Sequence, residues 1–328
     1  MGLDVGGTTT RVMVADLAGR IIGTAHGGGG NPIPHGEAVA VRHIAEALRH
    51  ALADVDPARV GAGVMGLAGG PFADEVLGKV WQEAELSIVP RVLGDLELAY
   101  ASGTGSPGGS VVLSGTGAVA GECRDFDLTR RADGHGWLLG DRGSGYWLGR
   151  AAVEMTLDAI DCAHGCRQTS HTSARSGSGP PGRIAGLAAS VIEELVGDVP
   201  LGPHLVESIC DAVYGDSPIR LARLAPLVLA AAAEDDPDAC GLVDEAADHL
   251  LATLSTVRTA GSTLPVVLAG GILSPGSPVA SAVRSRVAAR WPGASISYAG
   301  STAGAAAWLA ARDLGLADEE LRTRLTVL

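Results

Sequence analysis

The feature that most constrains the fold of this chain is a short plan that occurs twice: an apolar strand, a bend of glycine and threonine, and a second apolar strand. The first copy reads LDVGGTTTRVMVA from Leu3, and the second reads VVLSGTGAVA from Val111. Two similar hairpins in one chain indicate a duplicated unit. Glycine lets the backbone turn tightly, and successive N–H groups at such a bend form a cradle for phosphate oxygens. Two Gly-rich hairpins without a ligand are the alternative, because the chain has 47 glycines.

The rest of the chain reads as strands and helices in alternation. A third glycine-marked strand end, VVLAGGI, begins at Val266. Mixed strands followed by strand–helix units are typical of an α/β layer fold, so we predict that class. The predicted helices are 37–53, 76–86, 96–101, 144–163, 278–290 and 302–312, and helices also dominate 184–260; the further strands are 60–67, 88–92, the Val266 strand and 296–298, with a loop at 26–32.

One stretch matches the dinucleotide-binding spacing GxGxxG but does not fit that motif. Gly103–Gly108 follows a predicted helix rather than a strand, and Pro107 would break the helix that the motif should open. We interpret it as a linker between two lobes. The first lobe would cover 1–108, to which the C-terminal helix 302–328 can add, and the second lobe would cover 109–301.

Composition excludes several classes of function. The net charge of −13 and the lack of a basic stripe argue against nucleic acid or an anionic membrane as partner. No apolar run approaches the roughly 20 residues of a membrane span and no secretory signal precedes Leu3, so we expect a cytoplasmic protein. Lys79, the only lysine, is followed by Val80, which excludes a Walker A loop and lysine-dependent chemistry.

The five cysteines are odd in number and scattered, which favours reduced thiols. Cys162 and Cys166, together with His164 and His171, resemble a zinc set, but no second cysteine pair follows them. We therefore interpret them as incidental thiols beside a Ser/Gly/Pro-rich segment at 167–182.

Two aspartates are candidate catalytic or ligand groups. Asp95 follows Gly94 at the end of a predicted strand and opens a helix, where its carboxylate could accept a proton from a substrate hydroxyl. Asp141 lies in the aromatic and Gly-rich run WLLGDRGSGYW, which is typical of a polar ligand loop. Each could instead cap the helix that follows it, since aspartate is favoured at that position.

The three glycine-marked stretches together resemble those of a known superfamily. DVGGTTTR at Asp4–Arg11 is similar to the first phosphate motif of the proteins that join sugar kinases, heat-shock chaperone ATPases and actin. LSGTG at Leu113–Gly117 is similar to the second phosphate motif, and LAGG at Leu268–Gly271 to the adenosine motif. The resemblance implies a two-lobed actin-like ATPase fold of duplicated ribonuclease-H-like domains, with nucleotide and substrate in the cleft between the lobes.

Within that superfamily the chain resembles the N-acetylglucosamine kinase branch, which is related to the activator ATPases of acyl-CoA reductases and dehydratases. The matching stretches are GGGNP at Gly28–Pro32, Gly94–Asp95, and GWLLGDRGSGYW at Gly136–Trp147, the most specific of the three. They occur in the order of that branch and, with the phosphate and adenosine motifs, cover essentially the whole chain.

The resemblance implies ATP and Mg²⁺ as cofactors. Asp4 would hold the metal, through water, and phosphoryl transfer needs mainly positioning and charge neutralisation, so a site without lysine suffices. The residues implied for the nucleotide are Gly6, Gly7, Thr8, Thr9, Arg11, Thr116 and Gly117 at the phosphates, and Gly270 and Gly271 at the adenosine.

The resemblance also implies a sugar site, with Asp95 as the base on the 6-hydroxyl of an amino sugar. N-acetylglucosamine, giving N-acetylglucosamine 6-phosphate, is the expected substrate, and glucosamine is the first alternative. Arg142 stands where the branch usually has glutamate, so we expect this residue to affect which amino sugar is preferred. The residues implied for sugar binding are Asn31, Asp95, Gly115, Thr116, Asp141 and Ser144.

Two rival functions use the same fold. An activator ATPase would drive a partner enzyme and carry an iron–sulfur cluster on interface cysteines, an arrangement that Cys162 and Cys166 fit poorly. A non-catalytic sugar sensor should lack the base, whereas Asp95 is present. Homodimers are common in the family, so we expect one here.

Overall fold

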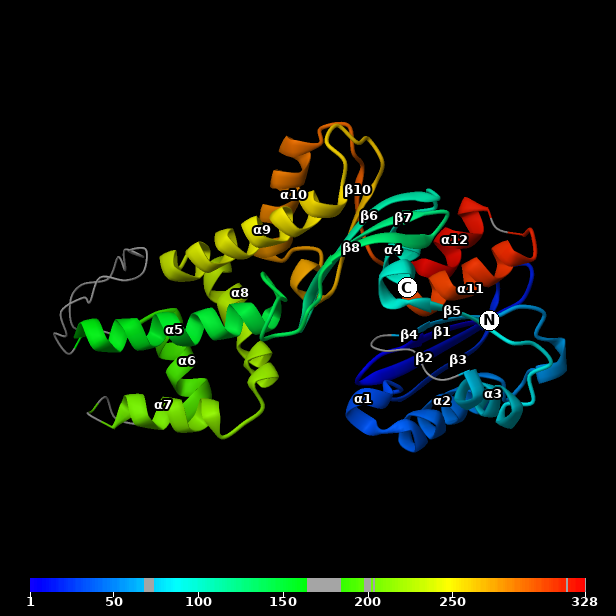
Figure 1. The fold of residues 1–328 in the computed structure, drawn as a ribbon, viewed down its shortest axis with the longest axis horizontal. Coiled ribbons are helices and arrows are strands. Elements are labelled where there is room, and N and C mark those ends of the chain that lie inside the picture. Colours follow the sequence, from blue (N-terminus) through cyan, green and yellow to red (C-terminus); the bar gives the residue numbers. More distant parts are fainter. Residues whose placement is uncertain (68–73, 164–183, 198–201, 203, 317, 328) are drawn as a thin grey trace.

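The computed structural model describes residues 1–67, 74–163, 184–197, 202, 204–316 and 318–327. Within these residues the chain forms two five-stranded mixed sheets with helices around and between them (Figure 1). The predicted α/β class is confirmed.

The first sheet has the order β3-β2-β1-β4-β5. Strands β1, β2 and β3 pair antiparallel as a meander, whereas β4 and β5 join parallel and so need helical crossovers. Helix α2 packs on β2 and β3 and is amphipathic, with Ile44 and Leu48 buried against Leu3 and Val5. The bounds are β1 Gly2–Val5, β2 Thr9–Ala15, β3 Ile21–Gly28, α1 Pro32–His35, α2 Glu37–Ala51, the 3₁₀ turn η1 Pro57–Arg59, β4 Val64–Leu67, α3 Asp74–Glu83 and β5 Arg91–Gly94.

The second sheet repeats the first. Its order, β10-β9-β6-β7-β8, has the same antiparallel meander and the same two parallel strands. The duplication predicted from the two glycine bends is therefore confirmed, since each bend joins the first two strands of its sheet. The bounds are β6 Gly108–Ser114, β7 Ala118–Arg124, β8 Asp127–Asp133, β9 Val266–Ala269 and β10 Ile296–Tyr298.

A helical layer packs on the outer face of the second sheet and extends beyond it (Figure 1). Helix α9 contacts β6, β7 and β8, and α5, α8 and α10 pack against α9. Leu250, Leu254 and Val112 are fully buried in the core that these elements share. The bounds are α5 Gly145–Ala163, α6 Leu187–Val196, α7 Leu205–Tyr214, η2 Pro218–Leu224, α8 Ala225–Ala233, α9 Pro237–Val257, η3 Gly271–Leu273 and α10 Pro278–Arg290.

Two helices lie between the sheets and form a third core. They are α4 (Asp95–Gly103) and α11 (Thr302–Asp313), and the closing helix α12 (Glu319–Thr326) packs on α11. Val64 of the first sheet and Val267 of the second share this core. Helix α11 is rich in alanine, which lets the backbone of β1 approach so closely that a Cβ on Gly2 would lie 2.1 Å from the Ala303 carbonyl oxygen.

Most predicted elements match the structure, and three do not. The helix 278–290 and the strand 296–298 have the predicted bounds, whereas the strand predicted at 60–67 begins only at Val64. The strand predicted at 88–92 is observed at Arg91–Gly94, because β5 pairs in parallel with the short strand Val64–Leu67. The loop predicted from His26 is wrong for its first three residues: β3 continues through Gly28, because the His43 ring of α2 fills the space of the missing side chain. Residues 68–73, which follow β4, and the predicted Ser/Gly/Pro-rich segment 167–182 lie outside the described residues. In the described ranges, the apolar length of every helix falls short of a membrane crossing.

Candidate active site

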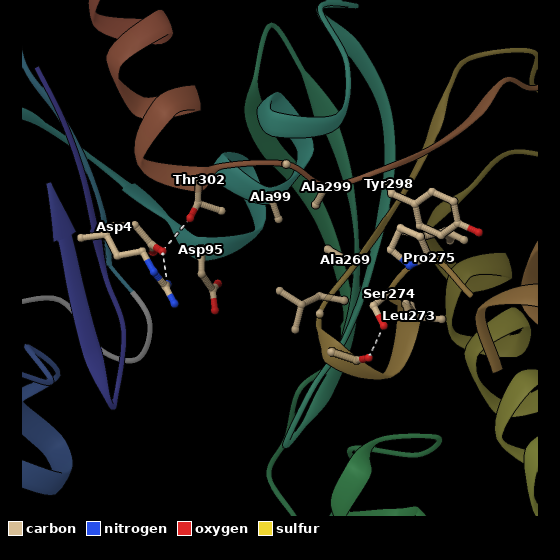
Figure 2. A pocket seen from close by; sticks show the side chains of 16 residues that line it. Asp4, Asp95, Ala99, Ala269, Leu273, Ser274, Pro275, Tyr298, Ala299 and Thr302 are labelled. Carbon is tan, nitrogen blue, oxygen red and sulfur yellow. Dashed lines mark hydrogen bonds and ion pairs between the residues drawn. The ribbon is translucent and has the colours of Figure 1, made fainter. Parts of the chain in front are cut away.

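A cavity of about 470 Å³ lies between the two sheets, with walls from both (Figure 2). The charged side chains Asp4, Arg11 and Asp95 line the wall nearer the first sheet, and the opposite wall is made by β9, η3 and the start of the β10–α11 connection. Five of the predicted site residues line the cavity: Asp4, Arg11, Asp95, Gly270 and Gly271. The lining also includes Ser274, Pro275, Tyr298, Ala299 and Thr302, which were not predicted from the sequence.

Asp4 faces the cavity because of the alternation of its strand. Leu3 and Val5 point to the core under α2, so Asp4 between them points to the opposite face, toward α11. Its Oδ2 accepts hydrogen bonds from Thr302 Oγ1 at 2.6 Å and from Arg11 Nη1 at 3.2 Å. The carboxylate is thereby fixed in orientation and stays partly exposed, and carboxylate oxygens are the ligands that Mg²⁺ prefers. Asp4 thus fits a metal-holding role.

Asp95 is the first residue of α4, and its side chain points into the cavity beside Asp4 (Figure 2). The cap position of this helix is Gly94, and no side chain caps it, so the structure does not support the cap interpretation of Asp95. Burial raises the pKa of Asp95, and the negative charge of Asp4 adds to the rise. The N–H of Leu96 and the Arg131 guanidinium oppose it. Asp95 is therefore a partly desolvated carboxylate suited to accept a proton.

The first glycine bend, Gly6–Thr8, joins β1 to β2 and rests on the loop that follows β3. The Gly6 N–H donates to Thr9 O at 2.9 Å, and the Gly6 carbonyl accepts from Gly30 N–H at 3.0 Å. A Cβ on Gly29 would lie 2.2 Å from the Gly7 oxygen, so this approach requires glycine there. Asn31 follows the loop directly, but it is not among the residues that line the cavity.

The second bend, Gly115–Gly117, joins β6 to β7 in the same way and rests on the start of α5. The Gly145 and Tyr146 N–H groups donate to the carbonyls of Gly115 and Thr116 at 2.7 and 3.2 Å. Gly270 packs beside this bend: its φ is +90°, and a Cβ there would lie 2.2 Å from Ser114 O. The second phosphate motif and the adenosine motif are thus in direct contact.

Asp141 contacts the second bend and is not among the residues that line the cavity. Its Oδ1 accepts from Ala118 N–H at 3.1 Å, and a Cβ on Gly117 would lie 2.9 Å from either of its carboxylate oxygens. The Asp133 carboxylate in turn accepts the N–H groups of Asp141 and Arg142, at 2.8 and 3.2 Å. Burial raises the pKa of Asp141, the charge of Asp133 adds to the rise, and Arg131 opposes it.

Ser144 holds the cap position that was considered for Asp141. Its Oγ accepts a hydrogen bond from Trp147 N–H at 3.1 Å in the first turn of α5, and the residue is fully buried. A buried serine engaged in this way supports the helix that anchors the second bend.

Thr302 is the site residue that sequence reasoning missed most clearly. Its hydroxyl bonds Asp4 although the two residues lie 298 positions apart. The signal in the sequence was the Ser-Thr pair that opens the alanine-rich helix, but such a pair normally predicts only a cap, and Ser301 does fill that role by accepting from Gly304 N–H.

The cysteines give no sign of a shared site in the part of the chain that the structure covers. Cys162 is an exposed free thiol at the end of α5, and Cys123 is buried in a strand. Cys166, His164 and His171 lie outside the described residues.

The repeated sheets, the two helices between them and the cavity define the two-lobed actin-like ATPase fold. This chain belongs to the BadF/BadG/BcrA/BcrD ATPase family, whose profile matches residues 1–308. The resemblance noted in the sequence is thereby confirmed at the level of the family.

Relatives of known description agree with this placement. The chain is 29% identical over 174 residues to an N-acetyl-D-glucosamine kinase from Dictyostelium discoideum, a match that covers 49% of this chain and about half (54%) of that relative. A protein assigned as an N-acetylglucosamine kinase from Chromobacterium violaceum superposes with a TM-score of 0.70 and 26% identity, over 94% of this chain and 97% of that one. A ROK-family glucokinase from Streptomyces griseus, solved with glucose and AMPPNP, has the same fold, with a TM-score of 0.55 and 20% identity over 95% and 97% of the two chains.

Proposed function

We propose that this protein is an ATP-dependent sugar kinase that phosphorylates the 6-hydroxyl of an amino sugar, N-acetylglucosamine first. The observation that carries the proposal is the position of Asp95, a partly buried carboxylate that shares a cavity with Asp4 and the adenosine-motif glycines. An ATPase that only hydrolyses nucleotide has no sugar hydroxyl to deprotonate. The relatives described as N-acetylglucosamine kinases support the choice of sugar.

The nucleotide side of the site follows from the backbone. Gly270 and Gly271 line the cavity without side chains, which leaves room for a nucleoside against η3. The two bends, Gly6–Thr8 and Gly115–Gly117, would offer N–H groups to the β- and γ-phosphates, and Arg11 a positive charge. Bound Mg²⁺, held by Asp4 through water, would neutralise charge on the phosphates.

The sugar side rests on Asp95 and on the loops around the two bends. Asp95 is ionised beforehand and accepts the proton of the 6-hydroxyl as that oxygen attacks the γ-phosphorus; the bond from the γ-phosphorus to the β–γ bridging oxygen breaks, and ADP leaves. Asn31 and Asp141 hold other hydroxyls, and Arg142 lies beside Asp141 where it can influence the substituent on the amino group. We propose further that the lobes are 1–108 with 302–328, and 109–301, and that the enzyme is a homodimer.

The test is a coupled assay of ADP release from Mg·ATP with a panel of N-acetylglucosamine, glucosamine, N-acetylmannosamine and glucose, each product identified by mass. We expect sugar-dependent ADP release with the highest kcat/KM for N-acetylglucosamine and a 6-phosphate product. ADP release that is the same with and without every sugar would overturn the proposal and favour the activator-type ATPase. Binding of a sugar without any turnover would favour a sensor.

A further inference from the structure

The two glycine bends hold their carbonyl groups in the same manner. In the second bend, two successive carbonyls, of Gly115 and Thr116, accept from the Gly145 and Tyr146 N–H groups at 2.7 and 3.2 Å. In a trans peptide the C=O and the next N–H point in opposite directions. The N–H groups of Thr116 and Gly117 are therefore turned away from α5.

The first bend has the same arrangement, with one difference. The Gly6 carbonyl accepts from the Gly30 N–H at 3.0 Å, but the Gly7 carbonyl lies 2.6 Å from Nε2 of His35. A carbonyl oxygen only accepts, so Nε2 carries the hydrogen. By the same peptide geometry, the N–H groups of Gly7 and Thr8 point away from Gly30 and His35. In this bend, a side chain takes the place that a helix amide has in the other.

The backbone N–H groups of the two bends also correspond to one another. In each bend the first glycine uses its own N–H internally: Gly6 donates to Thr9 O and Gly115 to Gly117 O, both at 2.9 Å. Among the residues that the structure describes, the next two amides of each bend have no hydrogen-bond partner. Successive N–H groups without a partner can form an anion-binding concavity, which suits the phosphates of a nucleotide.

The loop behind the first bend keeps His35 in place. A Cβ on Gly29 would lie 2.2 Å from the Gly7 oxygen and 2.5 Å from His35 Nε2, so the contact is closely packed. His43 Nδ1 lies 2.8 Å from the Gly29 oxygen, and its ring meets the His35 ring edge-on with centroids 6.1 Å apart.

We propose that His35 is a positioning residue for phosphate binding: its Nε2–H fixes the Gly7 carbonyl and thereby aims the Thr8 N–H at a β- or γ-phosphate oxygen. His35 does not touch the phosphate itself. The inference rests on the proposed function only in taking the anion to be the triphosphate of a nucleotide.

The test compares AMPPNP with AMP by calorimetry, because AMP lacks the β- and γ-phosphates. His35→Leu removes the donor, and we expect AMPPNP to bind about tenfold more weakly while AMP binding stays unchanged. His35→Gln keeps an N–H donor at a similar reach and should restore most of the AMPPNP affinity. His50→Leu, on the exposed face of α2, is the matched control and should change neither ligand.

Several results would overturn the inference. They are equal weakening of AMP and AMPPNP by His35→Leu, no effect on either ligand, or no rescue by His35→Gln. Selective loss of AMPPNP that is rescued by glutamine supports His35 whatever the sugar panel gives, so failure of the sugar assay is distinguishable from failure of this proposal.

Discussion

Thr302 Oγ1 donates a 2.6 Å hydrogen bond to Asp4 Oδ2 and so joins the first strand of the protein to the start of α11. The same carboxylate oxygen accepts from Arg11 on the neighbouring strand. The orientation of the proposed metal-holding group thus depends on a helix from the far end of the chain. Since α11 also lies between the two sheets, any shift of that helix would move the Thr302 hydroxyl and so change its hydrogen bond to Asp4.

Thr302→Val should weaken the use of Mg²⁺. Valine has nearly the shape of threonine but cannot donate, so within the described residues the Asp4 carboxylate keeps Arg11 as its one hydrogen-bond partner and can rotate. A hydrogen bond to a charged group contributes roughly 1.5–3 kcal/mol, so we expect about a tenfold rise in the Mg²⁺ concentration for half-maximal rate. Thr323→Val is the control, because Thr323 lies on the exposed face of α12 and its hydroxyl donates to the Glu319 carbonyl of the same helix. An unchanged Mg²⁺ dependence would remove Thr302 from the site.

Asp95→Asn should lower kcat by about 10²–10⁴ while AMPPNP affinity stays near that of the wild type. Asparagine keeps the size and can hydrogen-bond a hydroxyl, but it cannot take its proton. Because burial disfavours the ionised form of Asp95, the variant should melt no lower than the wild type at neutral pH. Asp127→Asn, on exposed β8, serves as control. A variant with more than about a tenth of the wild-type kcat contradicts the general-base role.

The raised pKa of Asp95 predicts opposite effects of pH on activity and on stability. A base must be ionised, so kcat/KM should fall as the pH falls through this raised pKa. The folded-state pKa lies above the unfolded one, so the contribution of Asp95 to stability is present at low pH and is lost as the pH rises through the same window. Rate and melting temperature against pH, for wild type and Asp95→Asn, check both slopes.

Arg131 allows a second test of the pH dependence that we assign to Asp95. Its positive charge lowers the pKa of Asp95, so Arg131→Gln should move the acid limb of the rate profile to higher pH. Arg130→Gln, one residue away and bonded to α9 carbonyls, should leave it in place. If both variants shift the limb equally, the group that titrates is not Asp95.

The sequence predicted those parts of the fold that depend on local pattern. The two hairpins and the strand at 296–298 follow from apolar alternation and glycine, and the structure confirms them. The contact of Asp4 with Thr302 could not be predicted, because pairing between distant segments depends on how the helices pack. The sequence predicts Ser144 for the sugar, and in the structure its Oγ also accepts the capping hydrogen bond from Trp147 N–H; a single sequence cannot distinguish the two uses.

Two helix glycines should respond in opposite ways to alanine. A Cβ on Gly149 of α5 would lie 1.9 Å from the Leu221 carbonyl oxygen, so Gly149→Ala should force α5 from η2 and destabilise by about 1–3 kcal/mol. Gly241 of α9 has no atom within 4 Å of its Cβ position, so Gly241→Ala should stabilise by roughly 0.5–1 kcal/mol. Urea unfolding measures both. If both substitutions change the free energy of unfolding in the same direction, the result would contradict the packing of α5 on η2.

Arg142→Glu should change which amino sugar is preferred. Arg142 is exposed, its N–H is held by Asp133, and no ion pair involves its side chain in the described part of the chain. A free amino sugar carries a positive charge when protonated, which arginine repels and glutamate attracts, whereas an acetylated one is neutral.

We therefore expect the ratio of kcat/KM for glucosamine over N-acetylglucosamine to rise about tenfold in Arg142→Glu. The ratio for Arg142→Gln should lie between those of the wild type and Arg142→Glu. High salt should shrink the difference, since exposed charges are screened. Arg150→Glu, on the exposed side of α5 and paired with Glu154, is the matched control and should leave the ratio unchanged. If kcat/KM falls equally for both sugars in Arg142→Glu, the side chain supports the loop or the nucleotide, and the choice of sugar is set elsewhere.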